Sequence, residues 1–115
     1  MNNYENYIKV VLDKDANIVK FESTLDDVEI DSKSVIGKNW FETFIDYSDL
    51  EKVMNVFNNL LNNQVEEWKT YKNDIKLPDG THRFIDFTNE VIVVNDEKFI
   101  SSFGIEHMYK KQSCS

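Results

Sequence analysis

The feature that most constrains this chain is one amphipathic helix set between β-prone segments. Counting from Leu50, apolar side chains recur 3, 4, 7, 10 and 11 residues further along, which places them on one stripe of a helix: Val53, Met54, Phe57, Leu60 and Leu61. Ser48 and Glu51 have the spacing of a capping box at its start, and the polar residues 62–64 predict its end. An apolar stripe of this kind needs a second layer to pack against.

The flanking segments supply a sheet as that layer. Residues 8–12 and 18–21 predict two strands joined by an Asp/Asn-rich turn. Residues 22–36 and 39–45 predict short helical turns, and the segments 67–77, 82–94 and 99–107 predict three further strands joined by two hairpins. The element order β-β-α-β-β-β predicts an α+β fold, a five-stranded antiparallel sheet with helices on one face.

Size and charge narrow the class of protein. At 115 residues the chain predicts a single domain, with a core over about 8–108, a short N-terminal lead and a C-terminal tail. A formal net charge of −8 disfavours nucleic acid and anionic membrane surfaces as partners. The sequence shows no bilayer-spanning apolar run and no signal peptide, and Cys114 is the one cysteine. These features predict a cytoplasmic protein.

The turn after the first strand has a partial match to a calcium-binding loop. Asp13, Asp15 and Asn17 occupy the first, third and fifth positions of such a loop. The sixth position is Ile18 where the loop needs glycine, and the twelfth is Thr24 where it needs a bidentate glutamate. A plain hairpin turn is therefore the favoured interpretation.

Several short motifs, in order and at consistent spacing, resemble those of the PAS domain family. The resemblance covers nearly the whole chain, and it rests on Gly37-Lys38-Asn39-Trp40-Phe41 before the long helix, Asp79-Gly80, Arg83-Phe84-Ile85 and the closing Gly104-Ile105-Glu106. The sequence departs from the family at Glu29-Ile30-Asp31, at Asn17 and at Glu106-His107-Met108, where PAS domains often read Gly-Tyr-Ser, glycine and Asp-Ile-Thr. The last departure weakens the family's usual C-terminal signal-exit motif.

The resemblance implies a sensory or regulatory module of bacterial signal transduction. Such a module would bind a small ligand between helices and sheet, would form a homodimer or contact an effector domain, and would have no catalytic activity of its own. Two alternatives stay open: a ligand-free dimerisation module, and a small cone-shaped enzyme. The enzyme is less favoured because strand alternation places Asp86 on the outer face and because no nucleophile–base pair is evident. The chain could be a module of a larger signalling protein or a stand-alone member.

Flavin and haem are disfavoured as cofactors. Light-sensing flavin-binding relatives carry a reactive cysteine in a Gly-Arg-Asn-Cys-Arg-Phe segment, and this chain has Trp40 at that position, with Cys114 far away in the tail. Haem-binding relatives use a histidine of the long helix, whereas here the two histidines are His82 and His107. No Cys/His group has the spacing of a zinc site, so we expect no metal.

Alternation along the strands selects residues for a pocket between sheet and helices. Arg83, Ile85, Phe87 and Asn89 share one strand face, and alignment to the family turns that face inward. A buried Asn89 amide needs partners, and backbone or water is favoured over a ligand. Arg83 is interpreted as a solvated charge rather than a carboxylate clamp. The pocket candidates are Trp40, Phe41, Phe44, Met54, Phe57, Tyr71, Asn73, Ile75, Ile85, Phe87, Asn89 and Ser102.

The opposite face of the sheet is a second candidate site. The same alternation places Phe84, Phe99, Phe103 and Ile105 there. A cluster of phenylalanines on one sheet face suggests that something covers it, and a homodimer through this face is the hypothesis.

Overall fold

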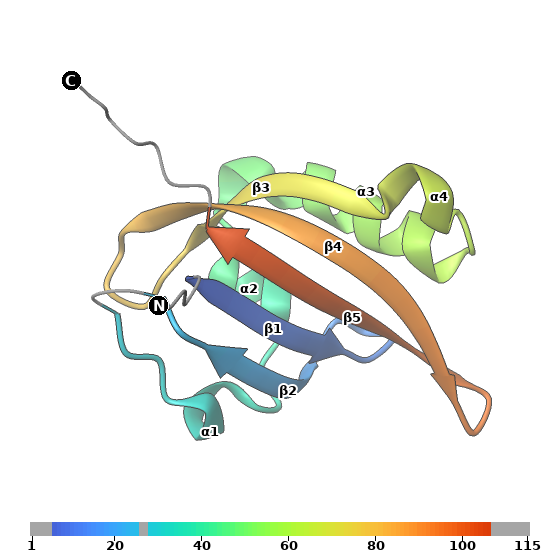
Figure 1. Ribbon diagram of the computed structural model, residues 1–115, viewed down its shortest axis with the longest axis horizontal. Coiled ribbons are helices and arrows are strands. Elements are labelled where there is room, and N and C mark those ends of the chain that lie inside the picture. The colour runs from blue at the N-terminus through green and yellow to red at the C-terminus, as the bar shows by residue number, and fades with distance from the viewer. Residues whose placement is uncertain (1–5, 26–27, 107–115) are drawn as a thin grey trace, which may run out of the picture.

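The computed structural model describes residues 6–25 and 28–106, so the predictions on His107, Met108 and Cys114 lie outside the described residues. Figure 1 shows a twisted antiparallel sheet with short helices and one longer helix packed on one of its faces. The elements are β1 (Tyr7–Leu12), β2 (Ile18–Ser23), α1 (Ser32–Val35), α2 (Trp40–Phe44), a 3-10 turn η1 (Tyr47–Asp49), α3 (Leu50–Leu61), α4 (Val65–Trp68), β3 (Thr70–Lys76), β4 (His82–Val94) and β5 (Glu97–Glu106).

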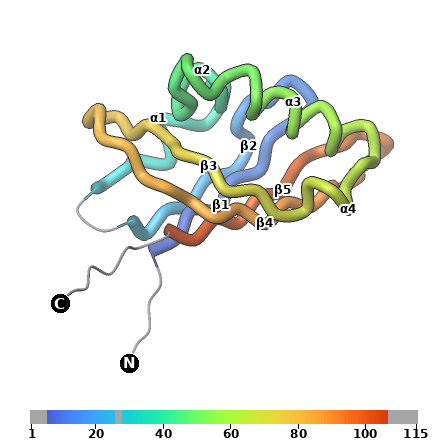
Figure 2. The backbone as a smooth tube through the Cα atoms, turned by 90° about the horizontal axis from the view of Figure 1, so that it is seen from above, coloured from blue at the N-terminus to red at the C-terminus, as the bar shows by residue number. Residues whose placement is uncertain are grey.

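The five strands lie in the order β2-β1-β5-β4-β3, and every neighbouring pair is antiparallel. The first and the last strand of the chain therefore lie side by side in the middle of the sheet, with Val10 opposite Ser102. Seen from above, α2 and α3 lie on the same side of the sheet (Figure 2). The predicted α+β architecture with helices on one face is confirmed.

The buried side chains form one core between that helix layer and the inner face of the sheet. Phe44 of α2 is fully buried, and its ring stacks on Phe21 of β2 with 5.6 Å between the ring centroids. The apolar stripe of α3 contributes Val53, Phe57 and Leu60 to the same core. The predicted stripe thus packs on the sheet as its periodicity indicates.

Three local predictions were wrong. The capping box does not form at the start of α3, because the Ser48 hydroxyl donates to Asp46 Oδ2 at 2.8 Å and Asp49 is the N-cap residue. Of residues 22–36, the first two belong to β2 and only 32–35 are helical. The segment 67–77 begins in the helical turn α4 before β3 starts at Thr70. In each case tertiary contacts override a weak local propensity.

The turns follow their sequences more closely. Asp13 Oδ1 accepts hydrogen bonds from the backbone N–H groups of Asp15 and Asn17, each at 2.9 Å, so its carboxylate holds a hairpin turn. The β4–β5 connection is a two-residue turn at Asn95 and Asp96, both with positive φ, as tight hairpins require. No helix in the described part of the chain is long and apolar enough to span a bilayer.

Candidate functional site

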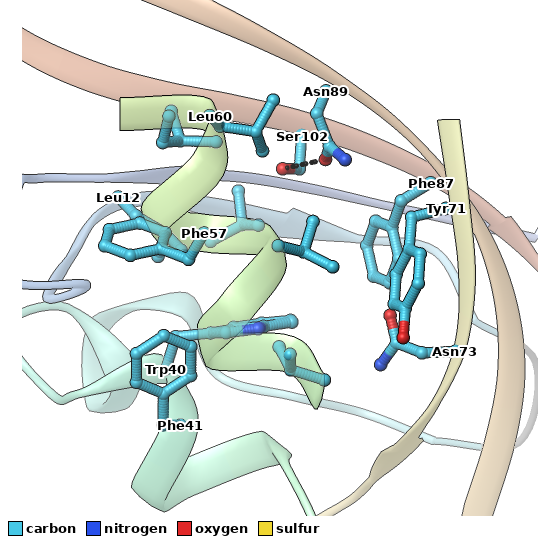
Figure 3. A pocket seen from close by; sticks show the side chains of 14 residues that line it. Leu12, Trp40, Phe41, Phe57, Leu60, Tyr71, Asn73, Phe87, Asn89 and Ser102 are labelled. Atoms are coloured by element: carbon cyan, nitrogen blue, oxygen red, sulfur yellow. Dashed lines mark hydrogen bonds between the residues drawn. The ribbon is translucent and has the colours of Figure 1, made fainter. Parts of the chain in front are cut away.

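A small cavity of about 50 Å³ lies between α2 and α3 on one side and the inner face of the sheet on the other. Figure 3 shows its walls: helix side chains lie opposite side chains from β3, β4 and β5. It is lined by Val10, Leu12, Trp40, Phe41, Val53, Val56, Phe57, Leu60, Tyr71, Asn73, Phe87, Asn89, Ile100 and Ser102. We call this hollow the inner cavity.

The α2 wall is fixed in place by Asn39. Its side-chain oxygen accepts from the N–H groups of Phe41 (3.0 Å) and Glu42 (3.3 Å), which caps the short helix. Its side-chain nitrogen donates to the backbone carbonyl of Asp15 at 3.0 Å, which ties the helix to the first hairpin turn. The indole of Trp40 is thereby held against the core, at 5% exposure, edge-on to the Phe87 ring at 6.2 Å.

One end of the inner cavity carries a hydrogen-bonded polar pair. The Ser102 hydroxyl of β5 donates to Asn89 Oδ1 of β4 at 2.7 Å, and both residues are buried (Figure 3). Asn89 Nδ2 donates in turn to the backbone carbonyl of Trp68 at 3.0 Å. The expected requirement for partners is therefore met by protein groups, one of them backbone, and one N–H of the Asn89 amide is left for a further acceptor.

Tyr71 and Asn73, both on β3, form the polar part of the opposite wall. The Asn73 amide donates to the backbone carbonyl of Asp74 at 2.9 Å. Burial raises the pKa of the Tyr71 phenol, and the negative charge of Asp49 adds to the effect. The phenol is thus neutral at physiological pH and offers an O–H group rather than a charge.

The structure brings eight of the predicted pocket residues together around the inner cavity: Trp40, Phe41, Phe57, Tyr71, Asn73, Phe87, Asn89 and Ser102. Four others do not line it. Phe44, Ile75 and Ile85 are fully buried in the neighbouring core, and Met54 is 40% exposed because it lies on the outward side of α3. Val53, the residue before Met54, does face the inner cavity, so one step along the helix moves a side chain from the cavity wall to the surface.

Six lining residues were not among the pocket candidates: Val10, Leu12, Val53, Val56, Leu60 and Ile100. The alternation of β1 contains the signal for the first two, since Ile8, Val10 and Leu12 share one strand face. Val53 and Leu60 belong to the predicted apolar stripe, and Val56 extends it. Because these residues are aliphatic, the sequence pattern does not distinguish a residue that lines a cavity from one that is packed in the core.

The interpretation of Arg83 as a solvated charge was wrong. Its Nη1 donates to Glu106 Oε1 at 2.8 Å, and both side chains are largely buried. The pair joins the inner faces of β4 and β5 near the end of the sheet, and neither residue lines the inner cavity. Arg83 is therefore neutralised within the fold and does not supply a positive charge to a cavity ligand.

The chemistry of the inner cavity is neutral. All of its lining side chains are uncharged, and its polar atoms are those of Tyr71, Asn73, Asn89, Ser102 and the Trp40 indole. Within residues 6–25 and 28–106, no three His, Cys, Asp or Glu side chains gather as metal ligands would. The walls are suited to packing and hydrogen bonding, because none of these groups is placed as an acid–base or nucleophile pair.

The predicted dimer-face residues lie on the outer face of the sheet. Phe84, Phe103 and Ile105 are 42%, 38% and 37% exposed, and Phe99 is half-buried. Phe103 packs beside the ring of Tyr7 at 5.3 Å and pairs with Lys9 on β1.

Comparison with known proteins gives structural neighbours only. Neither the protein-family models nor the curated proteins match this sequence. Among solved structures, the PAS domain of the quorum-sensing receptor RpfR from Cronobacter turicensis, in complex with BDSF, has a TM-score of 0.70 at 21% identity, covering 94% of this chain and 100% of that one. The PAS-B domain of Drosophila melanogaster Cycle, with bound ethylene glycol, has a TM-score of 0.65 at 8% identity, covering 87% and 99%.

A third neighbour is the PAS domain of a protein from Colwellia psychrerythraea, with a TM-score of 0.60 at 16% identity, covering 92% of this chain and 88% of that one. Each of the three matches extends over most of the chain. The expectation drawn from the glycine-containing segment, the hairpin and the closing strand is therefore confirmed at the level of the fold, and this chain has the fold of a PAS domain.

Proposed function

We propose that this chain is a sensory module that binds a small, largely apolar, uncharged molecule in the inner cavity. The observation that carries the proposal is the composition of the cavity wall: aromatic and aliphatic side chains surround one buried polar pair, Asn89 and Ser102. Ligand sites typically combine apolar walls with a few convergent polar groups. Two neighbours of the same fold were solved with small molecules, RpfR with BDSF and Cycle with ethylene glycol.

The absence of charge in the lining decides which ligands are favoured. A carboxylate would lose its hydration in the inner cavity and would meet no cation there, since Arg83 is paired with Glu106 outside it. A neutral hydroxyl can accept from the remaining N–H of Asn89 and donate to Ser102 Oγ, whose own proton goes to Asn89 Oδ1, and a carbonyl can accept from the same Asn89 N–H. The ligand is therefore an uncharged molecule with one hydrogen-bonding end.

The small volume of the inner cavity supports a binding mode in which the walls rearrange. About 50 Å³ holds a few water molecules, whereas ligand pockets typically measure about 300–1,000 Å³. A ligand would thus stabilise a more open arrangement, and this population shift is how binding would become a signal.

Matched titrations test this function. The purified protein is first examined by native mass spectrometry for a retained molecule, and then titrated with 1-hexanol and with hexanoate while the side-chain amide signals of Asn89 and Asn73 are followed by NMR. We expect 1-hexanol to shift the Asn89 signal and to bind more tightly than hexanoate. In N89L, binding should weaken by about 1–3 kcal/mol because a buried partner is lost. Tighter binding of hexanoate would contradict the proposal.

The exposed residue next to Asn89 supplies the control. Thr88 lies on the outer face of the same strand, so T88V should leave 1-hexanol binding unchanged. Equal losses in N89L and T88V would show that the effect is general destabilisation rather than contact with the ligand.

A second function is favoured by the outer face. Phe103 and Ile105 present apolar area there, and they are flanked by Lys9 and Asp86, which pair with them across the strands. A two-fold contact between two copies of the chain would cover Phe103 and could bring Lys9 of one copy close to Asp86 of the other. We expect a homodimer in sedimentation velocity that F103S dissociates; a monomer at high concentration in the unmodified chain would contradict it.

A further inference from the structure

Beside the inner cavity lies a second hollow that is open at the surface. It is a groove of about 580 Å³ between α2, η1 and α3, and it is lined by Asp15, Asn39, Phe41, Glu42, Ile45, Tyr47, Leu50, Met54 and Lys76. We call it the outer groove. Phe41 is the residue that lines both hollows. The Phe41 side chain therefore lies at the boundary between the uncharged inner cavity and the outer groove.

The position of Phe41 would allow its side chain to move between the inner cavity and the outer groove. Trp40, Phe57 and Phe87 are also aromatic residues of the cavity wall, and all three are buried, whereas Phe41 is half-buried. Its ring meets Phe57 edge-on, with centroids 5.5 Å apart (Figure 3). Its backbone is held by the Asn39 cap, so a change at this site concerns the side chain rather than the helix.

The outer groove could also accommodate the Phe41 ring in a second orientation. The apolar side chains of Ile45, Leu50 and Met54 line the groove next to Phe41. A rotation of the ring away from Phe57 would exchange one apolar environment for another, and so would expose little additional apolar surface to water. The same rotation would join the inner cavity to the groove and enlarge it.

We propose that Phe41 is the gate through which a ligand reaches the inner cavity from the outer groove. This inference rests on the proposed ligand-binding function, and it adds the route and the residue that controls it. It also accounts for the small volume of the inner cavity, about 50 Å³, since a closed gate would reduce that volume.

A competing route lies across the cavity. Tyr71 and Asn73 of β3 are half-buried too, on the wall opposite Phe41 and Phe57 (Figure 3). The Tyr71 ring is held edge-on to Trp68 at 6.0 Å, and every residue of β3 is paired with β4. Opening there by moving β3 would break strand pairing that a rotation of Phe41 leaves intact, and the experiment separates the two routes.

Fluorescence quenching of Trp40 tests the gate without any knowledge of the ligand. The chain has two tryptophans, so W68F leaves Trp40 as the one emitter, and Trp40 lines the inner cavity. In this background we expect F41A to raise the bimolecular constant for quenching by acrylamide several-fold, and F41L to give a smaller rise. Tyr71→Ala should leave it unchanged.

The control is I75A, which removes a fully buried side chain that lines neither hollow. A rise in I75A equal to that in F41A would show that loss of stability exposes Trp40, and would overturn the gate. A rise in Tyr71→Ala but not in F41A would place the route at β3 and would also overturn it.

Stopped-flow mixing with 1-hexanol separates the gate from the function it serves. Faster association in F41A together with increased quenching supports both. Increased quenching without any 1-hexanol binding supports the gate and counts against the proposed ligand class. Binding of 1-hexanol with unchanged rates and unchanged quenching in F41A overturns the gate and leaves the ligand function standing.

Discussion

The two faces of strands β4 and β5 differ in what covers them, although the same residue types occur on both. On the inner face Ile85, Phe87 and Ile100 are buried under the helix layer. On the outer face Phe84 and Phe103 keep about two-fifths of their surface exposed. Apolar residues therefore build the fold on one side, and on the other they leave surface that the described chain does not fully cover.

This difference separates two kinds of consequence. Substitutions on the inner face should change the stability of the domain and the shape of the inner cavity, because packing there is close. Substitutions on the outer face should change association and little else.

Truncating a fully buried ring should give the largest effect. Phe44 stacks on Phe21 and lies 4.8 Å from the Trp40 ring, so F44A removes contacts on two sides and should lower the free energy of unfolding by about 3–5 kcal/mol. F84A is the matched change at an exposed phenylalanine and should cost under about 1 kcal/mol. Urea denaturation measures both. Similar losses for the two variants would mean that the outer face is as closely packed as the inner one.

Adding a single methyl group to the inner face should have the next largest effect. A Cβ at Gly104 would lie 2.4 Å from an Ile85 methyl and 2.7 Å from the Phe87 ring, so G104A should lower the free energy of unfolding by about 1–3 kcal/mol. Because Phe87 lines the inner cavity, Trp40 fluorescence should change as well. S101A, on the outer face of the same strand, should do neither. A G104A variant as stable as the parent would show that the cavity absorbs the displaced ring.

Much of this division can be predicted from sequence, because it depends on regular periodicity. Alternation along β4 places Ile85, Phe87 and Asn89 inward and Phe84 outward, and the burial of these four residues agrees. The stripe of α3 likewise identifies the helix that packs on the sheet. The start of α3 could not be predicted, because the Ser48 hydroxyl bonds to Asp46 instead of accepting from a backbone N–H of the helix, and Asp49 becomes the N-cap residue.

The candidate site was harder to predict, because a cavity is a property of fit rather than of residue type. Val53 and Met54 are neighbours on the same apolar stripe, yet one faces the inner cavity and the other the outer groove. Arg83 looks solvated from its place beside a turn, and its partner Glu106 is 23 residues away. The alternation of β4 and β5 does place Asn89 and Ser102 inward, but the bond between them depends on the register, which pairs these two residues directly.

The buried polar pair should give an intermediate effect with a distinct signature. N89A leaves the Ser102 hydroxyl and the Trp68 carbonyl without their partner and should cost about 1–3 kcal/mol, and S102A should cost less. The double variant should cost less than the sum, by about 0.5–3 kcal/mol of coupling. Additive losses in a double-mutant cycle would indicate that the two side chains do not interact, and the inner face would then lack this polar link between β4 and β5.

The smallest expected effect is on the pH dependence of stability, and it arises in the exposed turn between β3 and β4. Hydrogen bonds from the Thr81 hydroxyl (2.6 Å) and N–H (3.0 Å) hold the pKa of Asp79 below its usual value, in the turn between β3 and β4. A carboxyl whose pKa is lower in the folded state stabilises the fold above its unfolded pKa, and this contribution is lost as the pH falls through the folded pKa. T81V should therefore raise the pKa of Asp79, as followed by NMR titration of its side-chain carbon. It should also reduce the loss in free energy of unfolding that occurs when Asp79 is protonated in acid. The Asn89–Ser102 pair carries no titrating group, so its coupling energy should be the same at pH 7 and in acid; a coupling that weakens with Asp79 protonation would show that this turn and the inner face are not independent.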